Sequence, residues 1–137
     1  MLRCGLIVVA SLGLACAPPA QPHWVSVSGA GSPGRVEVDV NRVTSVGGGV
    51  TDVWFHQTYA TPHKLPTGEV SSAADVHYRV SCADHRLVML DMIGYGPDGH
   101  QLFAGNWPFD NTKWASPDST SSAGVGIRGY CRTVAAR

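Results

Sequence analysis

The chain has no net charge, few charged residues and no apolar segment long enough to span a membrane. Ten Lys and Arg residues balance ten Asp and Glu residues in a chain of 137. A nucleic-acid-binding protein normally carries a basic stripe, so this balance argues against nucleic acid as a partner. The apolar run at residues 6–14 is far shorter than the ~20 residues that cross a bilayer as a helix.

The sequence also lacks the common motifs of catalysis, metal binding and cofactor binding. No G-x-S-x-G motif marks a serine nucleophile, and the six histidines show no paired His/Cys ligand spacing. Residues 124–129 match G-x-G-x-x-G, but only eight residues follow Gly129, too few for a dinucleotide-binding fold. We therefore expect no enzyme activity, no catalytic residue, no metal and no cofactor. Asp91 is the unusual carboxylate: inside an apolar strand, it is either buried with a raised pKa, paired with a cation or turned to water.

The first fifteen residues have the pattern of an export signal. One positive charge in residues 1–5 precedes the uncharged apolar run, as in a secretory signal peptide; a buried strand is the alternative. Gly13-Leu14-Ala15-Cys16 resembles a bacterial lipobox. This motif predicts a signal peptide at residues 1–15, a lipidated Cys16 and a tether at residues 16–23. The alternative cut follows Ala17 and would leave Pro18 next to the scissile bond.

A lipid on Cys16 would make the membrane a partner of this chain. It would place the protein in the cell envelope, as an outer-membrane lipoprotein or in the periplasm. The cysteines support export, because Cys4 leaves with the signal and Cys16 belongs to the lipid site or the tether. Cys82 and Cys131 then remain, and one pair in an oxidising compartment predicts a disulfide. Closing a loop of about fifty residues would stabilise the fold by ~4 kcal/mol; the alternative is two free buried thiols.

Alternating apolar and polar residues predict β-strands along most of the chain. In residues 75–82 one face would point to the core (Val76, Tyr78, Val80, Cys82) and the other to water (Asp75, His77, Arg79, Ser81). Further strands are predicted at residues 24–27, 35–40, 50–59, 86–94 and 101–107. Between them we expect a brief turn at residues 41–45, a tight reversal at Gly47–Gly49 and a long loop at residues 60–72.

The C-terminal part predicts a helix. Pro117-Asp-Ser-Thr120 resembles a helix start, with Ser or Asp as the N-cap, and the segment from there to Cys131 is expected to be helical. Three glycines in it weaken that helix by ~1 kcal/mol each, so the disulfide would have to hold it. The predicted fold class is mainly β or α+β. It consists of a single antiparallel sheet of about six strands with a short C-terminal helix packed against it, in one domain at residues 24–137.

Several short motifs occur in a characteristic order. They are Trp24, Asp39-Val-Asn41, Val53-Trp-Phe55, Tyr78-x-Val-x-Cys82, Tyr95-Gly-Pro-Asp-Gly99, Trp114, Ser116-Pro-Asp-Ser119 and Cys131. This order, over roughly residues 24–132, resembles the surface-adhesin protein E family of Gram-negative bacteria. The resemblance implies a small antiparallel sheet domain with a packed helix, an outer-membrane lipid anchor and a disulfide between Cys82 and Cys131. It also implies adhesion to host cells and extracellular-matrix proteins. The glycine-rich C-terminal helix and the lack of a lysine-rich binding segment depart from the family.

Two hypotheses about function are compatible with these features. In the first, the chain is a cell-envelope lipoprotein that binds proteins and resembles a surface adhesin, with host or extracellular-matrix proteins as partners. Its candidate surface is the loop at residues 60–72 together with His77 and Arg79 on the wet strand face. In the second, it is a structural or accessory periplasmic protein, non-enzymatic and without an external ligand. The oligomeric state is open, and an exposed edge strand could pair two subunits into a dimer.

Overall fold

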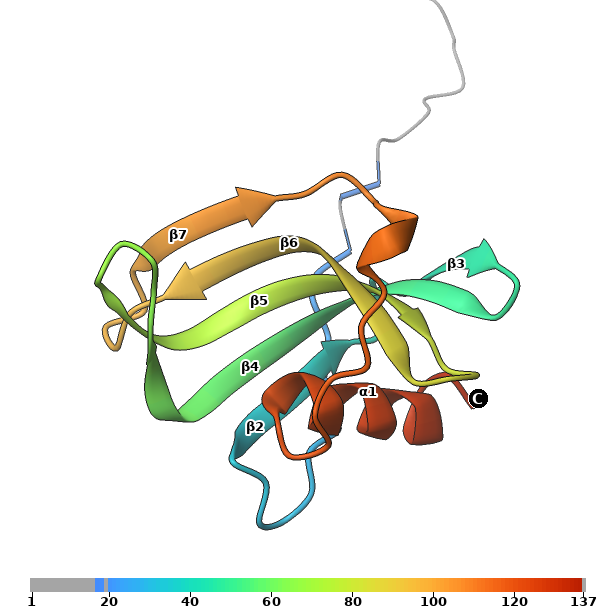
Figure 1. Cartoon of the computed structure of the whole chain (residues 1–137), viewed down its shortest axis with the longest axis horizontal. Helices are drawn as coiled ribbons and strands as arrows, with labels where there is room; N and C mark the ends of the chain where they lie inside the picture. Colours follow the sequence, from blue (N-terminus) through green and yellow to red (C-terminus); the bar gives the residue numbers. More distant parts are fainter. Residues whose placement is uncertain (1–16, 19, 137) are drawn as a thin grey trace, which may run out of the picture.

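The structure is a computed structural model that describes residues 17–18 and 20–136. Seven strands form one antiparallel sheet: β1 (Trp24–Ser26), β2 (Gly34–Asp39), β3 (Thr44–Gly47), β4 (Val50–Lys64), β5 (Val70–Ser81), β6 (Arg86–Tyr95) and β7 (Gln101–Asn106). They lie in the order β1-β2-β4-β5-β6-β7, with β3 beside the start of β4 (Figure 1). A 3-10 turn, η1 (Asn111–Lys113), and one helix, α1 (Ser122–Thr133), follow. The prediction of a single antiparallel sheet with a C-terminal helix is confirmed.

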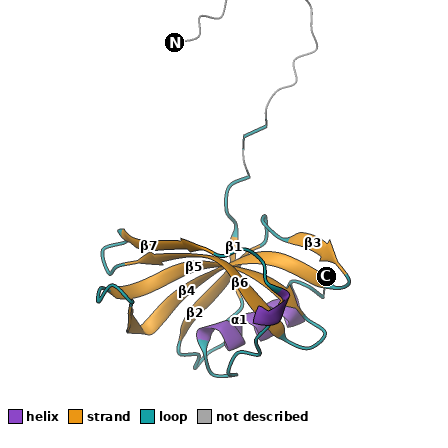
Figure 2. Ribbon diagram, turned by 45° about the horizontal axis from the view of Figure 1, so that its top comes forward, coloured by secondary structure: helices purple, strands orange, loops and turns teal. Residues whose placement is uncertain are grey.

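The helix α1 lies against one face of the sheet (Figure 2). We call this the covered face. The strand alternation places Val53 and Phe55 of β4 and Val76 and Val80 of β5 on it, each at most 1% exposed. These residues, with others from β2 and β6, meet Ile127 and Tyr130 of α1 in one apolar core. Burial of apolar side chains is the main stabilising contribution here, at about 1.5–3 kcal/mol for each large one.

Two of the three glycines of α1 allow it to pack closely on the sheet. A Cβ atom on Gly126 would come within 2.9 Å of the Phe55 ring, and one on Gly129 would overlap the backbone oxygen of Val27. These two residues weaken an isolated helix, but they let this helix approach the sheet and the segment that follows β1. Ser121 is the N-cap, and its side chain accepts a hydrogen bond from the Gly124 N–H. The helix is present as predicted, but its N-cap is Ser121, just after the predicted start at residues 117–120.

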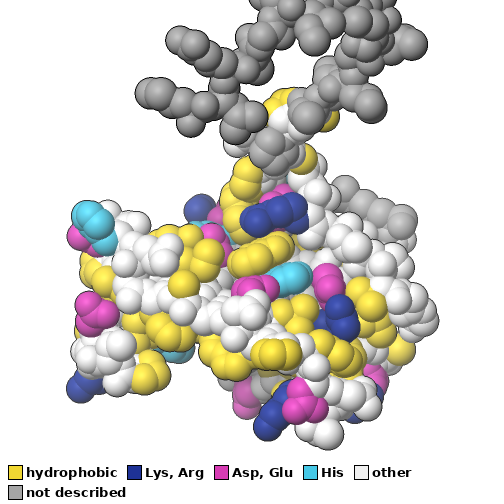
Figure 3. Space-filling view, turned by 90° about the horizontal axis from the view of Figure 1, so that it is seen from above, with side chains coloured by type: hydrophobic (Ala, Val, Ile, Leu, Met, Phe, Trp, Pro, Cys, Tyr) yellow, Lys and Arg dark blue, Asp and Glu magenta, His cyan; other side chains and the backbone are white. Residues whose placement is uncertain are grey.

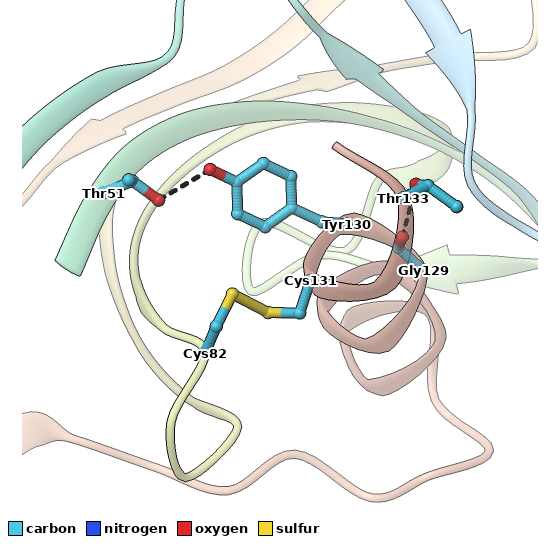
Figure 4. The surroundings of a disulfide bond; sticks show 6 residues. All are labelled: Thr51, Cys82, Gly129, Tyr130, Cys131 and Thr133. Carbon is cyan, nitrogen blue, oxygen red and sulfur yellow. Dashed lines mark hydrogen bonds between the residues drawn. A yellow bond between two sulfur atoms is a disulfide. The ribbon is translucent and has the colours of Figure 1, made fainter. Parts of the chain in front are cut away.

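A disulfide between Cys82 and Cys131 ties α1 to the end of β5 (Figure 4). The two Cα atoms are 5.5 Å apart, and 49 positions separate the residues in the sequence. Beside it, the Tyr130 hydroxyl and Thr51 Oγ1 of β4 form a hydrogen bond of 2.7 Å (Figure 4). The expected pairing of the two cysteines is therefore present. The expected signal segment, residues 1–15, and the expected lipid site, Cys16, lie outside the described residues.

One expectation about the strands was incomplete and another was wrong. The expected turn at residues 41–45 is present at residues 40–42, but residues 44–45 belong to β3, whose residues are all exposed and so give no alternation to detect. The expected loop at residues 60–72 is mostly strand, because β4 runs to Lys64 and β5 begins at Val70. Pro62 lacks an N–H, yet a bulge accommodates it: residues 59–62 of β4 face Ser72 alone, between the pairs Thr58↔Ala73 and His63↔Ser71.

The described residues include no helix with the length and apolarity needed to cross a membrane.

Candidate functional site

The second face of the sheet carries polar and aromatic side chains. We call it the open face, because in the described part of the chain no helix or strand packs over it, and the segment at residues 107–115 reaches one corner. Figure 3 views the molecule from the side opposite α1 and shows hydrophobic, basic, acidic and His side chains interleaved there. The strand register assigns the following residues to this face: Trp24, Glu37, Asp52, Trp54, His56, Asp75, His77, Arg79, Asp91 and Asn106.

The central row of the open face runs across four strands. The Trp54 ring of β4 stacks on the His77 ring of β5, with 4.8 Å between ring centroids and an interplanar angle of 7°. His77 Nδ1 lies 2.7 Å from Asp91 Oδ2 of β6, and Asn106 of β7 donates its amide to Asp91 Oδ1 at 2.5 Å. Each side chain in the row therefore holds its neighbour in place.

Asp91 reaches this row because of a bulge in β6. His77 pairs with Asp91 but the next residue, Tyr78, pairs with Met89, so Leu90 is an extra residue in β6. Without it, strict alternation from Leu87 would turn Asp91 to the covered face. Burial alone would raise the pKa of Asp91, but the hydrogen bonds from Asn106 and His77 outweigh it and hold that pKa below its ordinary value. Of the three alternatives for Asp91, the structure contradicts the buried carboxylate with a raised pKa and pairs the carboxylate with His77.

A second row lies beside the first, two residues further along β4. His56 Nδ1 of β4 is 2.6 Å from Asp75 Oδ1 of β5, and the Tyr95 hydroxyl donates to Asp75 Oδ2 at 3.0 Å. The hydrogen bond to Asp75 raises the pKa of His56 above its ordinary value, against the opposing effect of burial. The Trp24 ring of β1 lies against His56, with centroids 5.6 Å apart.

Two arginines stack on the aromatic rings of the open face. Arg79 of β5 makes a bidentate ion pair with Asp52, in which its Nε and Nη2 donate to the two carboxylate oxygens at 2.8 Å and 2.9 Å. The same guanidinium lies 4.5 Å from the centre of the Phe109 ring. Arg42 lies 4.9 Å from the centre of the Trp54 ring. Such cation–π contacts contribute ~0.5–1 kcal/mol each at exposed sites.

Arg42 is fixed in turn by a buried carboxylate. Asp39 is 0% exposed and accepts hydrogen bonds from the backbone N–H groups of His23 and Asn41 and from Arg42 Nε, at 2.9 Å, 3.0 Å and 2.5 Å. Burial would raise the pKa of Asp39, yet these bonds outweigh it and lower that pKa. The carboxylate therefore stays charged and holds the guanidinium over Trp54.

An apolar groove of about 850 Å³ lies beside Phe109, between the start of β6 and the segment at residues 107–115. Three of the five exposed large hydrophobic residues in the described chain line it: Met89, Trp107 and Phe109, at 37%, 42% and 43% exposure. Lys113 and Asp110 also contribute to its walls. The groove thus adds exposed apolar area to the charged and aromatic rows.

The structure brings together both predicted binding residues, since His77 and Arg79 lie two positions apart on the open face. It separates them from residues 60–64, which continue β4 beyond the bulge. Sequence reasoning did not assign Trp54, Arg42 or Phe109 to the site. Strand alternation could have assigned Trp54 to the open face, because its neighbours Val53 and Phe55 both point to the core. Among the described residues, no group of three or more His, Cys, Asp or Glu side chains is placed to hold a metal ion.

Comparisons with known proteins add little beyond the fold. No family model matches the chain, and no curated protein matches its sequence. Among solved structures, that of Haemophilus influenzae protein E is similar to this chain, with 11% identity and a TM-score of 0.48 over 88% of this chain and 94% of that one. At this identity and TM-score the similarity is a distant one of fold, and no property of protein E is carried over to this chain.

Proposed function

We propose that this chain is an exported, non-enzymatic protein-binding domain, and that the open face with its groove is the binding surface. The observation that carries the proposal is the set of aromatic, Arg and His side chains on the sheet face that α1 leaves uncovered. A merely solvated sheet face carries isolated polar residues. Trp, Tyr and Arg are instead the residues that dominate the energy of protein–protein interfaces.

The preorganisation of the open face also supports binding. Trp54, His77 and Asp91 are held by stacking and hydrogen bonds before any partner arrives. Ordering a free side chain at an interface costs about 0.5–1.5 kcal/mol, and most of that cost is avoided for side chains that are already fixed. Six strands at a spacing of about 4.8 Å make the face about 24 Å wide, enough for a standard interface of about 800 Å² on each partner.

The charges on the open face favour a protein partner over a nucleic acid. Asp52, Asp75 and Asp91 all lie on it, and each carboxylate is paired with an Arg or His. A nucleic acid needs unpaired cations for its phosphates and would be repelled by these carboxylates. A protein partner can instead add hydrogen bonds to the paired groups and cover the aromatic rings.

For the cellular setting, we propose the bacterial envelope, with a lipid on Cys16 as the anchor. The Cys82–Cys131 disulfide supports an oxidising compartment. Mass spectrometry of the mature N-terminus tests this part, because a diacylglyceryl-modified Cys16 would be its first residue. An unmodified N-terminus downstream of Cys16 would contradict the anchor.

The binding proposal is tested with a panel of purified extracellular-matrix proteins immobilised on a biosensor. The disulfide-bonded chain from residue 17 should bind at least one of them saturably, and Trp54→Ala should weaken that binding about tenfold or more. His100→Ala is the matched control, because His100 forms an exposed pair with Asp98 in the turn between β6 and β7 and belongs to neither row of the open face. The absence of saturable binding across the panel would favour the accessory periplasmic alternative. Equal loss in both variants would contradict the assignment of the surface.

A further inference from the structure

A second concave site lies on the side of the sheet that carries α1, where the N-terminus of this helix meets the bulge of β4. This pocket has a volume of about 360 Å³, within the range of about 300–1,000 Å³ that is usual for small-molecule sites. The bulge shapes the pocket, because residues 59–62 leave the regular ladder with β5 there. The rings of Tyr59 and His63 stack on each other with 4.0 Å between centroids, and both residues line the pocket.

Gln57 of β4 places a hydrogen-bond acceptor in this pocket. The residue is 4% exposed, and its Nε2 donates to the Tyr78 hydroxyl at 3.4 Å. Its Oε1 has no donor among the described residues. In that part of the chain every fully buried side-chain N or O atom has a partner, so Oε1 is open to the pocket that Gln57 lines. A nearly buried carbonyl oxygen that is open on one side accepts a hydrogen bond from a ligand or from water there.

The first turn of α1 presents hydrogen-bond donors to the same pocket. The N-cap hydroxyl of Ser121 accepts from the Gly124 N–H, and the Ser121 carbonyl accepts from Val125. For the N–H groups of Ser122 and Ala123, which also line the pocket, the described residues supply no acceptor. These two donors at the helix end therefore need an acceptor, whereas Gln57 Oε1 needs a donor.

This combination of groups favours a neutral ligand with hydroxyl groups. No Asp, Glu, Lys or Arg is among the described residues that line the pocket. An anion has no hydrogen to donate to Gln57 Oε1, and an ammonium group has no lone pair for the N–H groups of Ser122 and Ala123. A hydroxyl group both donates and accepts, so hydroxyl groups satisfy both sides of the pocket.

The remaining walls of the pocket favour a sugar ring. The aromatic rings of Tyr59 and His63, together with Ala60 and Pro33, provide apolar surface for the C–H groups of such a ring. Burial raises the pKa of Tyr59, so its hydroxyl is neutral at neutral pH. Further hydroxyl groups come from Thr61, Thr120, Ser121 and Ser122.

We propose that this pocket binds a neutral hexose unit of a glycan. One hydroxyl of the sugar would donate to Gln57 Oε1, and the oxygen of a neighbouring hydroxyl would accept from the N–H groups of Ser122 and Ala123. This site is separate from the open face, so it does not depend on the function proposed for that face.

The test is a titration of the isotopically labelled, disulfide-bonded chain with the methyl glycosides of glucose, galactose, mannose and N-acetylglucosamine, followed by amide NMR. At least one glycoside should shift the Ser122 and Ala123 amides saturably, and more than other amides. Sodium sulfate should not displace it. The absence of saturable shifts with all four glycosides, shifts that are largest elsewhere in the chain, or displacement by sulfate would overturn the proposal.

Two substitutions at Ser122 isolate the contribution of its backbone N–H. Ser122 is the first residue of α1, where proline is well tolerated, and Ser121 before it has φ −71° and ψ 158°, a conformation that suits a residue preceding proline. Ser122→Pro removes the hydroxyl and the N–H, whereas Ser122→Ala removes the hydroxyl alone and is the matched control. The proline variant should bind the glycoside about three- to tenfold more weakly than the alanine variant, by the loss of one hydrogen bond. Equal affinities would contradict the site.

A second pair of variants tests the acceptor. Gln57→Leu removes the amide at a similar side-chain size and should weaken glycoside binding about three- to tenfold. Gln101→Leu, at the exposed start of β7, makes the same change outside the pocket and should leave binding unchanged. Urea denaturation shows whether Gln57→Leu is folded, because this variant leaves the Tyr78 hydroxyl without its partner. A folded Gln57→Leu variant with the affinity of the parent would also overturn the proposal, and if this variant does not fold, the two Ser122 variants decide.

Discussion

The two faces of the sheet are built from alternate residues of the same strands and differ in what holds their side chains. On the covered face, Phe55 and Val76 are at most 1% exposed and are held by apolar contact with α1. On the open face, the side chains of His77 and Asp91 are 21% and 27% exposed and are held by one another. Exposed ion pairs contribute only about 0–1 kcal/mol each, so the open face adds little to stability. This is consistent with the binding role that we propose for its aromatic and charged residues.

Removing the disulfide should produce the largest change, because it releases α1 and opens the covered face as well. With both Cys82 and Cys131 replaced by Ser, the free energy of unfolding should fall by about 4 kcal/mol. Urea denaturation of the double variant and of the oxidised parent measures the difference. A loss below about 1 kcal/mol would show that glycine-mediated packing alone holds α1.

Substitutions at two neighbouring residues of β4, one on each face, allow the stability contributions of the two faces to be compared directly. Phe55→Ala should cost about 3–5 kcal/mol, since the ring is fully buried against Tyr78 and Tyr130. Trp54→Ala, one position earlier, should cost roughly 1–2 kcal/mol, because its ring is stacked but only partly buried. Denaturation of the two variants under the same conditions gives both values. Equal costs would mean that the open face is part of the core after all.

The hydroxyl of Tyr130 tests a polar contact at the margin of the covered face. Tyr130→Phe removes the hydrogen bond to Thr51 Oγ1 while keeping the ring, and should cost about 1 kcal/mol. Thr51→Val should cost a similar amount. In the double variant neither partner is left unsatisfied, so the two costs should not add. Strict additivity in this double-mutant cycle would indicate that the two groups do not interact.

The smallest expected effect is the contribution of the open face to the pH dependence of the free energy of unfolding. The pKa of His56 is raised above its ordinary 6.5 in the folded state by Asp75. Its contribution to stability is therefore fully present below about pH 6.5 and is lost as the pH rises through the raised value. Stability of the parent should fall slightly between pH 6 and pH 8, by less than about 1 kcal/mol. His56→Gln should flatten this slope, and an unchanged slope would assign the dependence to another group.

Alternation in the sequence was sufficient to predict most strands and the face of each residue in the segment 75–82. It placed Val76 and Val80 inward and His77 and Arg79 outward, because a strand has a side-chain period of two. It did not predict β3, whose residues Thr44–Gly47 are all exposed and carry no pattern. Counting the cysteines left Cys82 and Cys131 as a pair, and the structure joins them.

The rows of the open face could not be predicted because they depend on register across strands. His77 and Asp91 are 14 positions apart, and they meet only because Leu90 is an extra residue in β6. A bulge reverses the facing of every residue that follows it, and no local pattern in this strand marks where it occurs. The bulge around Pro62 had the same effect on β4, where residues 60–72 were predicted to form a loop.

The close packing of α1 on the sheet also bears on the order in which the chain folds. A twelve-residue helix with three glycines has too little intrinsic helicity to persist alone in water. Its docking surface exists only after β1, β2 and β4 have paired, and those contacts link distant parts of the chain. We therefore expect α1 to form last, in a step limited by the long-range strand pairing of the sheet. The Cys82–Cys131 disulfide would then form after α1 has docked, so it would stabilise the folded chain rather than direct its folding.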